Sequence, residues 1–129
     1  MTMENVQKIR PKYLDLFSIR LPVPGLVSIL HRISGLVLFL LLPFLLWLLD
    51  NSLHSRSSFA RFQAVISAPL VKLVLLGLIW AFLHHLFAGL RHIALDLDWG
   101  VNLEAGRATA KLVLVASLVL TAVLGAMLW

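Results

Sequence analysis

Three long apolar runs restrict the fold of this chain more than any other feature. They extend approximately over residues 26–49, 70–95 and 108–129. Each run is long enough to cross the hydrocarbon core of a bilayer, which takes about 20 helical residues. Backbone polar groups inside hydrocarbon must be satisfied within the segment, so runs of this kind form helices. We therefore predict an all-α membrane protein with three transmembrane helices in a single membrane-anchor domain.

The composition supports this class and limits the chemistry of the chain. Of the 129 residues, 60% are hydrophobic and 13% are charged, with a mean hydropathy of +0.96. Soluble domains carry about 25% charged residues. There is no cysteine, so disulfides, thiolate metal sites and iron–sulfur ligation are excluded from this chain. A bound metal would need histidine or oxygen ligands.

The charges are distributed unequally between the two ends of the predicted spans. Eight basic residues belong to one end, namely Lys8, Arg10, Lys12, Arg20, Arg32, Arg91, Arg107 and Lys111. The other end has three, Arg56, Arg61 and Lys72. The positive-inside rule then predicts that residues 1–25 and the loop at 97–107 face the cytoplasm, with the loop at 51–67 and the C-terminus in the periplasm. The net charge of +5 is thus explained by the orientation of the chain in a lipid bilayer. We expect no nucleic-acid partner.

Two groups of ionisable residues lie inside the predicted spans, near their cytoplasmic ends. An arginine at the centre of a membrane helix costs about 2.5–3.5 kcal/mol on insertion scales, so such residues mark a functional site by default. In the first group, Ser28 and Arg32 are four residues apart and share a helix face. They offer a hydroxyl and a guanidinium to one ligand. The alternative is that Arg32 extends to the lipid headgroups.

The second group contains a stripe of small residues around a histidine. Gly77, Ala81, His85 and Gly89 recur at every fourth position and therefore lie on one face of the second span. Small residues one turn above and below His85 predict a flat recess beside its ring, as a porphyrin would require. The alternative is that the small residues only allow two helices to approach closely.

These residues form two motifs that resemble a known family. SILHRISG, from Ser28 to Gly35, and HxxxGxRHxxxD, from His85 to Asp96, are similar to motifs of the cytochrome b subunit of succinate dehydrogenase, the b556-type membrane anchor. RPKYLDLFSIRLPVPG at 10–25 and EAGRATAK at 104–111 resemble the enterobacterial branch of that family. The resemblance covers nearly the whole chain.

The resemblance implies an electron-transfer subunit of succinate:quinone oxidoreductase, respiratory complex II of the tricarboxylic acid cycle, in a bacterial inner membrane. It implies that a second small membrane anchor shares one haem b with this chain, each supplying one axial histidine, here His85. Ser28 and Arg32 would line the ubiquinone site beside the iron–sulfur subunit, and His31 and Arg32 would lie near the haem propionates. Electrons would arrive from succinate through the flavoprotein and iron–sulfur subunits. The isolated chain would carry no catalytic residues and would not be an enzyme.

Neighbouring polar residues leave several roles open. His84 points about 100° away from His85, so only one of the two can face a haem, and we expect His84 to face another helix or a haem propionate. His92 either pairs with Asp96 at the interface or contributes to the haem edge or to proton delivery. We expect Trp80 to face lipid.

Two other functions remain compatible with the sequence. If His31 and His85 faced each other, the chain would be a self-contained cytochrome with two histidine ligands. A channel, transporter subunit or helical scaffold without a redox role would use the same residues as polar contacts between helices.

Overall fold

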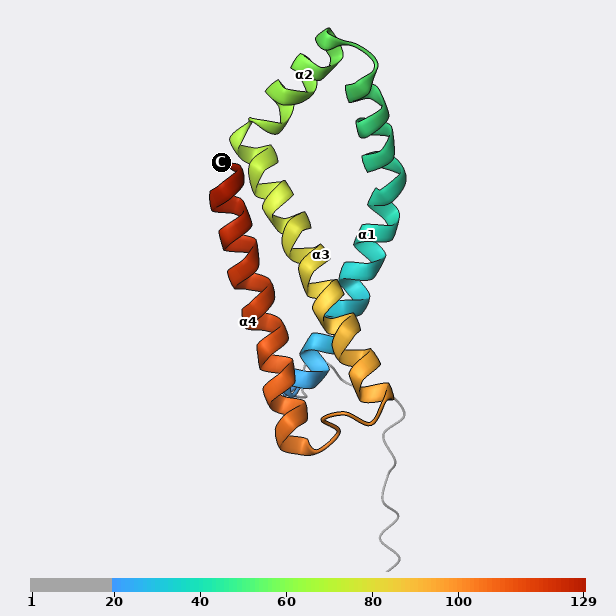
Figure 1. The fold of residues 1–129 in the computed structure, drawn as a ribbon, viewed down its shortest axis with the longest axis vertical. Helices are drawn as coiled ribbons and strands as arrows, with labels where there is room; N and C mark the ends of the chain where they lie inside the picture. The colour runs from blue at the N-terminus through green and yellow to red at the C-terminus, as the bar shows by residue number, and fades with distance from the viewer. Residues whose placement is uncertain (1–19) are drawn as a thin grey trace, which may run out of the picture.

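The computed structural model describes residues 20–129, which form four helices and, within that range, no strand. These are α1 (Val23–Leu53), α2 (Arg56–Ile66), α3 (Pro69–Asp96) and α4 (Leu103–Leu128) (Figure 1). The helices α1, α3 and α4 are long and apolar enough to cross a membrane, which confirms the prediction of an all-α, multi-pass membrane protein. The motif at 10–25 and the basic residues before Arg20 lie largely or wholly outside the described residues.

The helices α1 and α3 extend beyond their apolar runs at both ends, and α4 begins before its run. Pro22 precedes α1 and Pro24 lies in its first turn, where a missing backbone N–H removes no hydrogen bond. The side chain of Asn102 accepts a hydrogen bond of 2.8 Å from the backbone N–H of Ala105 and so caps α4. The helix α4 therefore begins five residues before the apolar run, and the connection from α3 is shorter than the predicted 97–107 loop.

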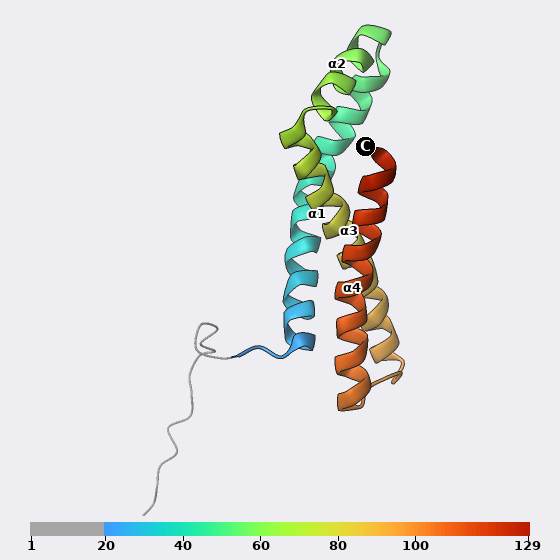
Figure 2. The same ribbon diagram turned by 90° about the vertical axis from the view of Figure 1, so that its left-hand side faces the viewer.

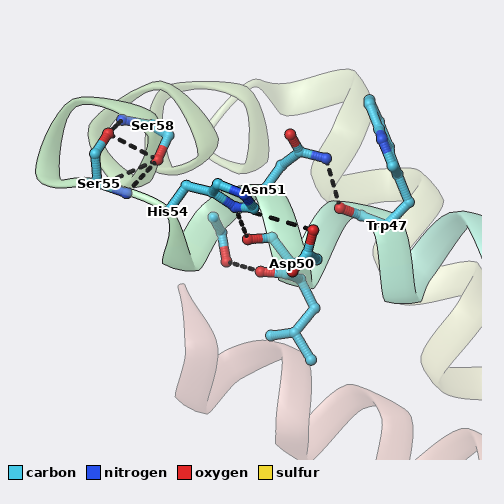
Figure 3. A network of polar contacts seen from close by, with 8 residues as sticks. Trp47, Asp50, Asn51, His54, Ser55 and Ser58 are labelled. Carbon is cyan, nitrogen blue, oxygen red and sulfur yellow. Dashed lines mark hydrogen bonds and ion pairs between the residues drawn. The ribbon is translucent and has the colours of Figure 1, made fainter.

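Polar contacts also end α1 and begin α2 (Figure 3). The His54 ring nitrogen Nδ1 lies 2.7 Å from the backbone oxygen of Asp50 and 3.9 Å from its carboxylate. One residue later, Ser55 and Ser58 form a reciprocal capping box, which satisfies two backbone N–H groups at the start of α2. The connection predicted at 51–67 thus contains a helix of its own.

The three long helices are packed together at one end, and α1 separates from α3 and α4 at the other. In Figure 1 and Figure 2, α4 runs alongside α3, whereas α1 crosses α3 and then diverges from it. The short helix α2 joins the two separated ends and contacts both α1 and α3. An apolar cavity of about 290 Å³ lies among these three helices. We call the opposite, closely packed end the histidine end; it contains the start of α1, the end of α3 and the start of α4.

The hydrophobic core lies at the histidine end and consists of small residues. Val27, Ala88, Ala110 and Val113 are buried together and join α1, α3 and α4. Small side chains allow helix backbones to approach closely in a membrane. Large apolar side chains mostly point outward, as Phe39 does with 73% of its surface exposed. The part of the bundle that holds the two polar motifs is therefore the part in which the helices are positioned most closely.

A second close approach predicts how the far ends of α3 and α4 respond to mutation. A Cβ atom on Gly125 would lie 2.6 Å from Cδ2 of Leu76, whereas one on Gly77 would meet nothing within 4 Å. We expect Gly125→Val to destabilise the full chain in detergent by about 1 kcal/mol, the low end of the overpacking range, because the end of the flexible Leu76 side chain can shift. Thermal unfolding measures this, with Gly77→Val as the matched control. Combining Gly125→Val with Leu76→Ala should restore most of the stability, and equal losses in the two glycine variants would contradict the packing described.

Candidate functional site

His85 lies on α3 with one ring nitrogen held by the backbone of α1. Its Nδ1 is 3.0 Å from the backbone oxygen of His31 and 3.4 Å from Oγ of Ser34. A carbonyl oxygen can only accept, so Nδ1 carries the proton and Nε2 presents its lone pair. Metal-ligating histidines are usually held in this way, with the second ring nitrogen donating to a carbonyl or carboxylate. The donor set therefore suits an axial metal ligand.

Gly35 permits this contact and was not predicted as a site residue. A Cβ atom at Gly35 would lie 2.7 Å from Cε1 and 3.1 Å from Nδ1 of His85, which a rigid imidazole cannot tolerate. Ser34 also donates a 3.0 Å hydrogen bond to the His31 oxygen, so that oxygen serves both side chains. The only signal in the sequence was that Ser34 and Gly35 end the SILHRISG motif, three and four residues after His31.

Three histidines from α1 and α3 form a cluster of neighbouring rings. The rings of His31 and His85 are nearly parallel, with centroids 4.2 Å apart and planes inclined by 13°. The rings of His31 and His92 are 5.1 Å apart and inclined by 49°. His92 thus contacts His31, and within residues 20–129 no ion pair joins it to Asp96. We call His31, His85 and His92 the histidine cluster.

The small residues on the His85 face of α3 do not border the open recess that the sequence predicted. A Cβ atom on Gly89 would lie 3.5 Å from Nε2 of His31, and one on Gly77 would meet nothing within 4 Å. The ring of His31 therefore occupies the space beside Gly89. The prediction of an open recess on that side of His85 is wrong, because a side chain from α1 fills it.

His84, the neighbour of His85, has the opposite environment. It is fully buried, and neither ring nitrogen has a hydrogen-bond partner among the described residues. Its ring lies 5.2 Å from that of Trp80, whose Nε1 is also buried without a partner in that range. Trp80, which is itself only half-buried, therefore packs against a buried side chain. A fully enclosed imidazole offers no nitrogen to a large planar group, whereas His85 is only half-buried.

Ser28 and Arg32 remain apart from the histidine cluster. Ser28 is half-buried and Arg32 is exposed. Neither side chain has a hydrogen bond or ion pair to another residue in the described part of the chain. Of the residues predicted in SILHR, the structure brings only His31 into contact with His85. Within residues 20–129, Ser28 and Arg32 therefore have no polar side-chain partner.

Arg91, the arginine of the second motif, connects two helices. Its Nε donates to Oγ1 of Thr109 and its Nη2 to the backbone oxygen of Gly106, both at 3.1 Å. These bonds join the end of α3 to the first turns of α4. The sequence places this residue in the charge asymmetry and in the motif, but it does not predict these bonds to α4.

Comparison with known proteins agrees with this arrangement of motifs on three membrane helices. Residues 6–124 match the model of the succinate dehydrogenase/fumarate reductase transmembrane subunit family. The chain is 38% identical over 121 residues to the succinate dehydrogenase cytochrome b556 subunit of Coxiella burnetii, covering 93% of this chain and 97% of that protein.

Two further relatives carry similar names. The chain is 33% identical over 101 residues to the succinate dehydrogenase cytochrome b556 subunit of Paracoccus denitrificans, covering 78% of each. It is 31% identical over 105 residues to the cytochrome b560 subunit of Reclinomonas americana, covering 78% of this chain and 73% of that protein. These findings confirm the resemblance drawn from the two motifs. The chain therefore belongs to the succinate dehydrogenase/fumarate reductase transmembrane subunit family and is a non-catalytic membrane subunit of that enzyme.

Proposed function

We propose that this subunit binds haem b and ubiquinone and passes electrons that originate from succinate to the quinone. The observation that carries the proposal is the hydrogen bond of 3.0 Å from Nδ1 of His85 to the backbone oxygen of His31. It holds the ring with Nδ1 as the donor and leaves the lone pair of Nε2 free, as a haem ligand would require. A bound haem would supply a one-electron redox centre at this site. The electrons would arrive through the flavoprotein and iron–sulfur subunits.

A second membrane anchor is proposed to supply the other axial ligand. Iron between two imidazoles lies in the plane of both rings, along the lone pairs of their nitrogens. The rings of His31 and His85 are instead stacked face to face at 4.2 Å, which argues against a self-contained cytochrome ligated by this pair. His31 and Arg32 are then left to bind the haem propionates, with His92 at the haem edge.

Ser28 and Arg32 are proposed as the quinone-binding residues. A quinone carbonyl accepts hydrogen bonds and gains negative charge on reduction. The hydroxyl of Ser28 and the fixed charge of Arg32 lie on one face of α1 and are free of partners among the described residues. Hydrogen bonds from these donors strengthen as the charge develops. They therefore stabilise the quinone during reduction more than they stabilise the bound oxidised quinone.

The topology proposed from the charges places the histidine end at the cytoplasmic face of a bacterial inner membrane. Within the described residues, that end carries Arg20, Arg32, Arg91, Arg107 and Lys111, and the other end carries Arg56, Arg61 and Lys72. The positive-inside rule then puts residues 1–25 in the cytoplasm and the C-terminus in the periplasm. The haem and quinone sites would therefore lie close to the soluble subunits.

The first prediction separates His85 from its neighbour. We expect His85→Ala to remove most of the haem from the purified complex, because it deletes the iron ligand. Losing that ligand should also weaken the complex, since cofactor binding contributes to assembly. His84→Ala is the matched control and should retain most of the haem, because its ring is enclosed and faces Trp80. The pyridine haemochrome assay measures both, and equal haem content in the wild type and His85→Ala would overturn the assignment.

The second prediction tests the close approach that positions the ligand. Gly35→Ala places a methyl group where the His85 ring now lies, so we expect a displaced ring, lower haem occupancy and a shifted reduced-minus-oxidised spectrum. Gly25→Ala is the control, because the nearest atom to its Cβ would be 3.6 Å away. If Gly35→Ala binds haem with an unchanged spectrum, the contact with α1 does not orient the ligand.

The third prediction concerns the quinone. We expect Ser28→Ala and Arg32→Leu to slow succinate–quinone turnover while sparing succinate oxidation by an artificial dye, which the soluble subunits perform. Removing a donor of this kind commonly lowers the rate by about 10²-fold, and less where water replaces the hydroxyl. Arg32→Leu should be the more severe change, since a haem propionate would also lose its counter-charge. Normal quinone reduction in two fully assembled variants would place the quinone elsewhere.

A further inference from the structure

A groove on the outer side of α3 and α4 lies away from the histidine cluster. It has a volume of about 430 Å³ and a lining that is apolar except for Arg91 and Thr109. Ala94, in the lining, is nine residues after His85 and therefore lies about 180° around α3 from it. The groove is thus separate from the surface of α3 that presents His85.

Arg91 gives this apolar groove an unmatched positive charge. Arg91 is half-buried as a residue, and its two partners, Thr109 and the Gly106 carbonyl, are both neutral. Among residues 20–129 no carboxylate lies within 4.0 Å of it. A partly buried arginine without a counter-charge is unfavourable at membrane depth. The groove therefore favours a ligand that has both an anionic group and an apolar segment.

The position of the groove indicates where such a ligand comes from. Trp99 contributes to one end of the lining and is 71% exposed, and tryptophan is enriched at the level of the lipid headgroups. The remaining lining, formed by residues such as Phe87, Leu90 and Val113, extends from there along the helices. Charge and shape together thus match a lipid headgroup followed by an acyl chain. An apolar helix of another protein would leave the charge of Arg91 unmatched.

We propose that this groove binds one anionic glycerophospholipid, with its phosphate on Arg91 and an acyl chain between α3 and α4. Basic recesses between membrane helices at the cytoplasmic side are suited to anionic headgroups. The free Nη1 of Arg91 can donate to the phosphate while Nε and Nη2 keep their bonds to α4. The proposal does not depend on the haem and quinone assignments.

Native mass spectrometry of the complete purified complex tests this proposal. The complex is delipidated in a neutral detergent and titrated with palmitoyl-oleoyl phosphatidylglycerol. We expect one tightly retained lipid per copy of this chain, bound about tenfold more weakly by Arg91→Gln because a charge-assisted hydrogen bond is lost. Arg107→Gln removes the same charge from an exposed position on α4 outside the groove, and it should bind lipid like the wild type.

A second pair of variants leaves Arg91 and its bonds to α4 intact. Ala94→Phe fills the groove with a ring and should also weaken retention of the lipid about tenfold. Ala122→Phe makes the same change at an exposed position of α4 outside the groove and should have no effect. Phosphatidylcholine should bind the wild type more weakly than phosphatidylglycerol, and excess inorganic phosphate should not displace the lipid.

Several outcomes would overturn the proposal. One is equal retention of phosphatidylcholine and phosphatidylglycerol, and another is an equal loss in Arg91→Gln and Arg107→Gln. Displacement of the lipid by inorganic phosphate would identify a simple anion site instead. A change in the number of copies per complex in Ala94→Phe alone would identify a protein partner in the groove.

Discussion

The close approach of α1 and α3 at Gly35 is the contact on which the site depends. It brings the ring of His85 against the α1 backbone, where a Cβ atom would lie 2.7 Å from Cε1. Only at that separation can Nδ1 of His85 reach the backbone oxygen of His31. The small residues of the core, including Ala88 and Ala110, maintain the same spacing between backbones. The close packing of α1 against α3 therefore also orients the ring of the proposed ligand.

The adjacent histidines show how far one step along a helix can change the chemistry of a side chain. His84 and His85 point about 100° apart. His84 is fully buried, and neither of its ring nitrogens is paired among the described residues. His85 is half-buried, and its Nδ1 is hydrogen-bonded to a carbonyl oxygen. Both have the same intrinsic capacity to bind iron, so their difference arises entirely from the surrounding helices. The greater exposure of His85 and the hydrogen bond at its Nδ1 are the reasons for proposing it, and not His84, as the ligand.

The sequence was sufficient for the features that depend on composition and local spacing. Hydropathy identified the three spans, and motif spacing distinguished the two polar groups. It could not reveal that Trp80 packs on His84, that His31 fills the space beside Gly89, or that Gly35 receives the His85 ring. Each of these depends on the register of α1 against α3, which is set by packing between residues about fifty positions apart. The early start of α4 was missed for another reason, since the cap at Asn102 lies outside the apolar run.

The divergence of α1 from α3 has a mechanical consequence for a protein in a bilayer. The two helices are in close contact at the histidine end, and beyond it they enclose an apolar cavity of about 290 Å³ with α2. Membrane helices accommodate changes in bilayer thickness by tilting, at a modest cost per ångström. Tilt of α1 meets least resistance at the end where it is not packed against α3. We therefore expect changes in bilayer thickness to be absorbed on the side remote from His85, so that the spacing between α1 and α3 at the histidine end depends little on the thickness of the surrounding bilayer.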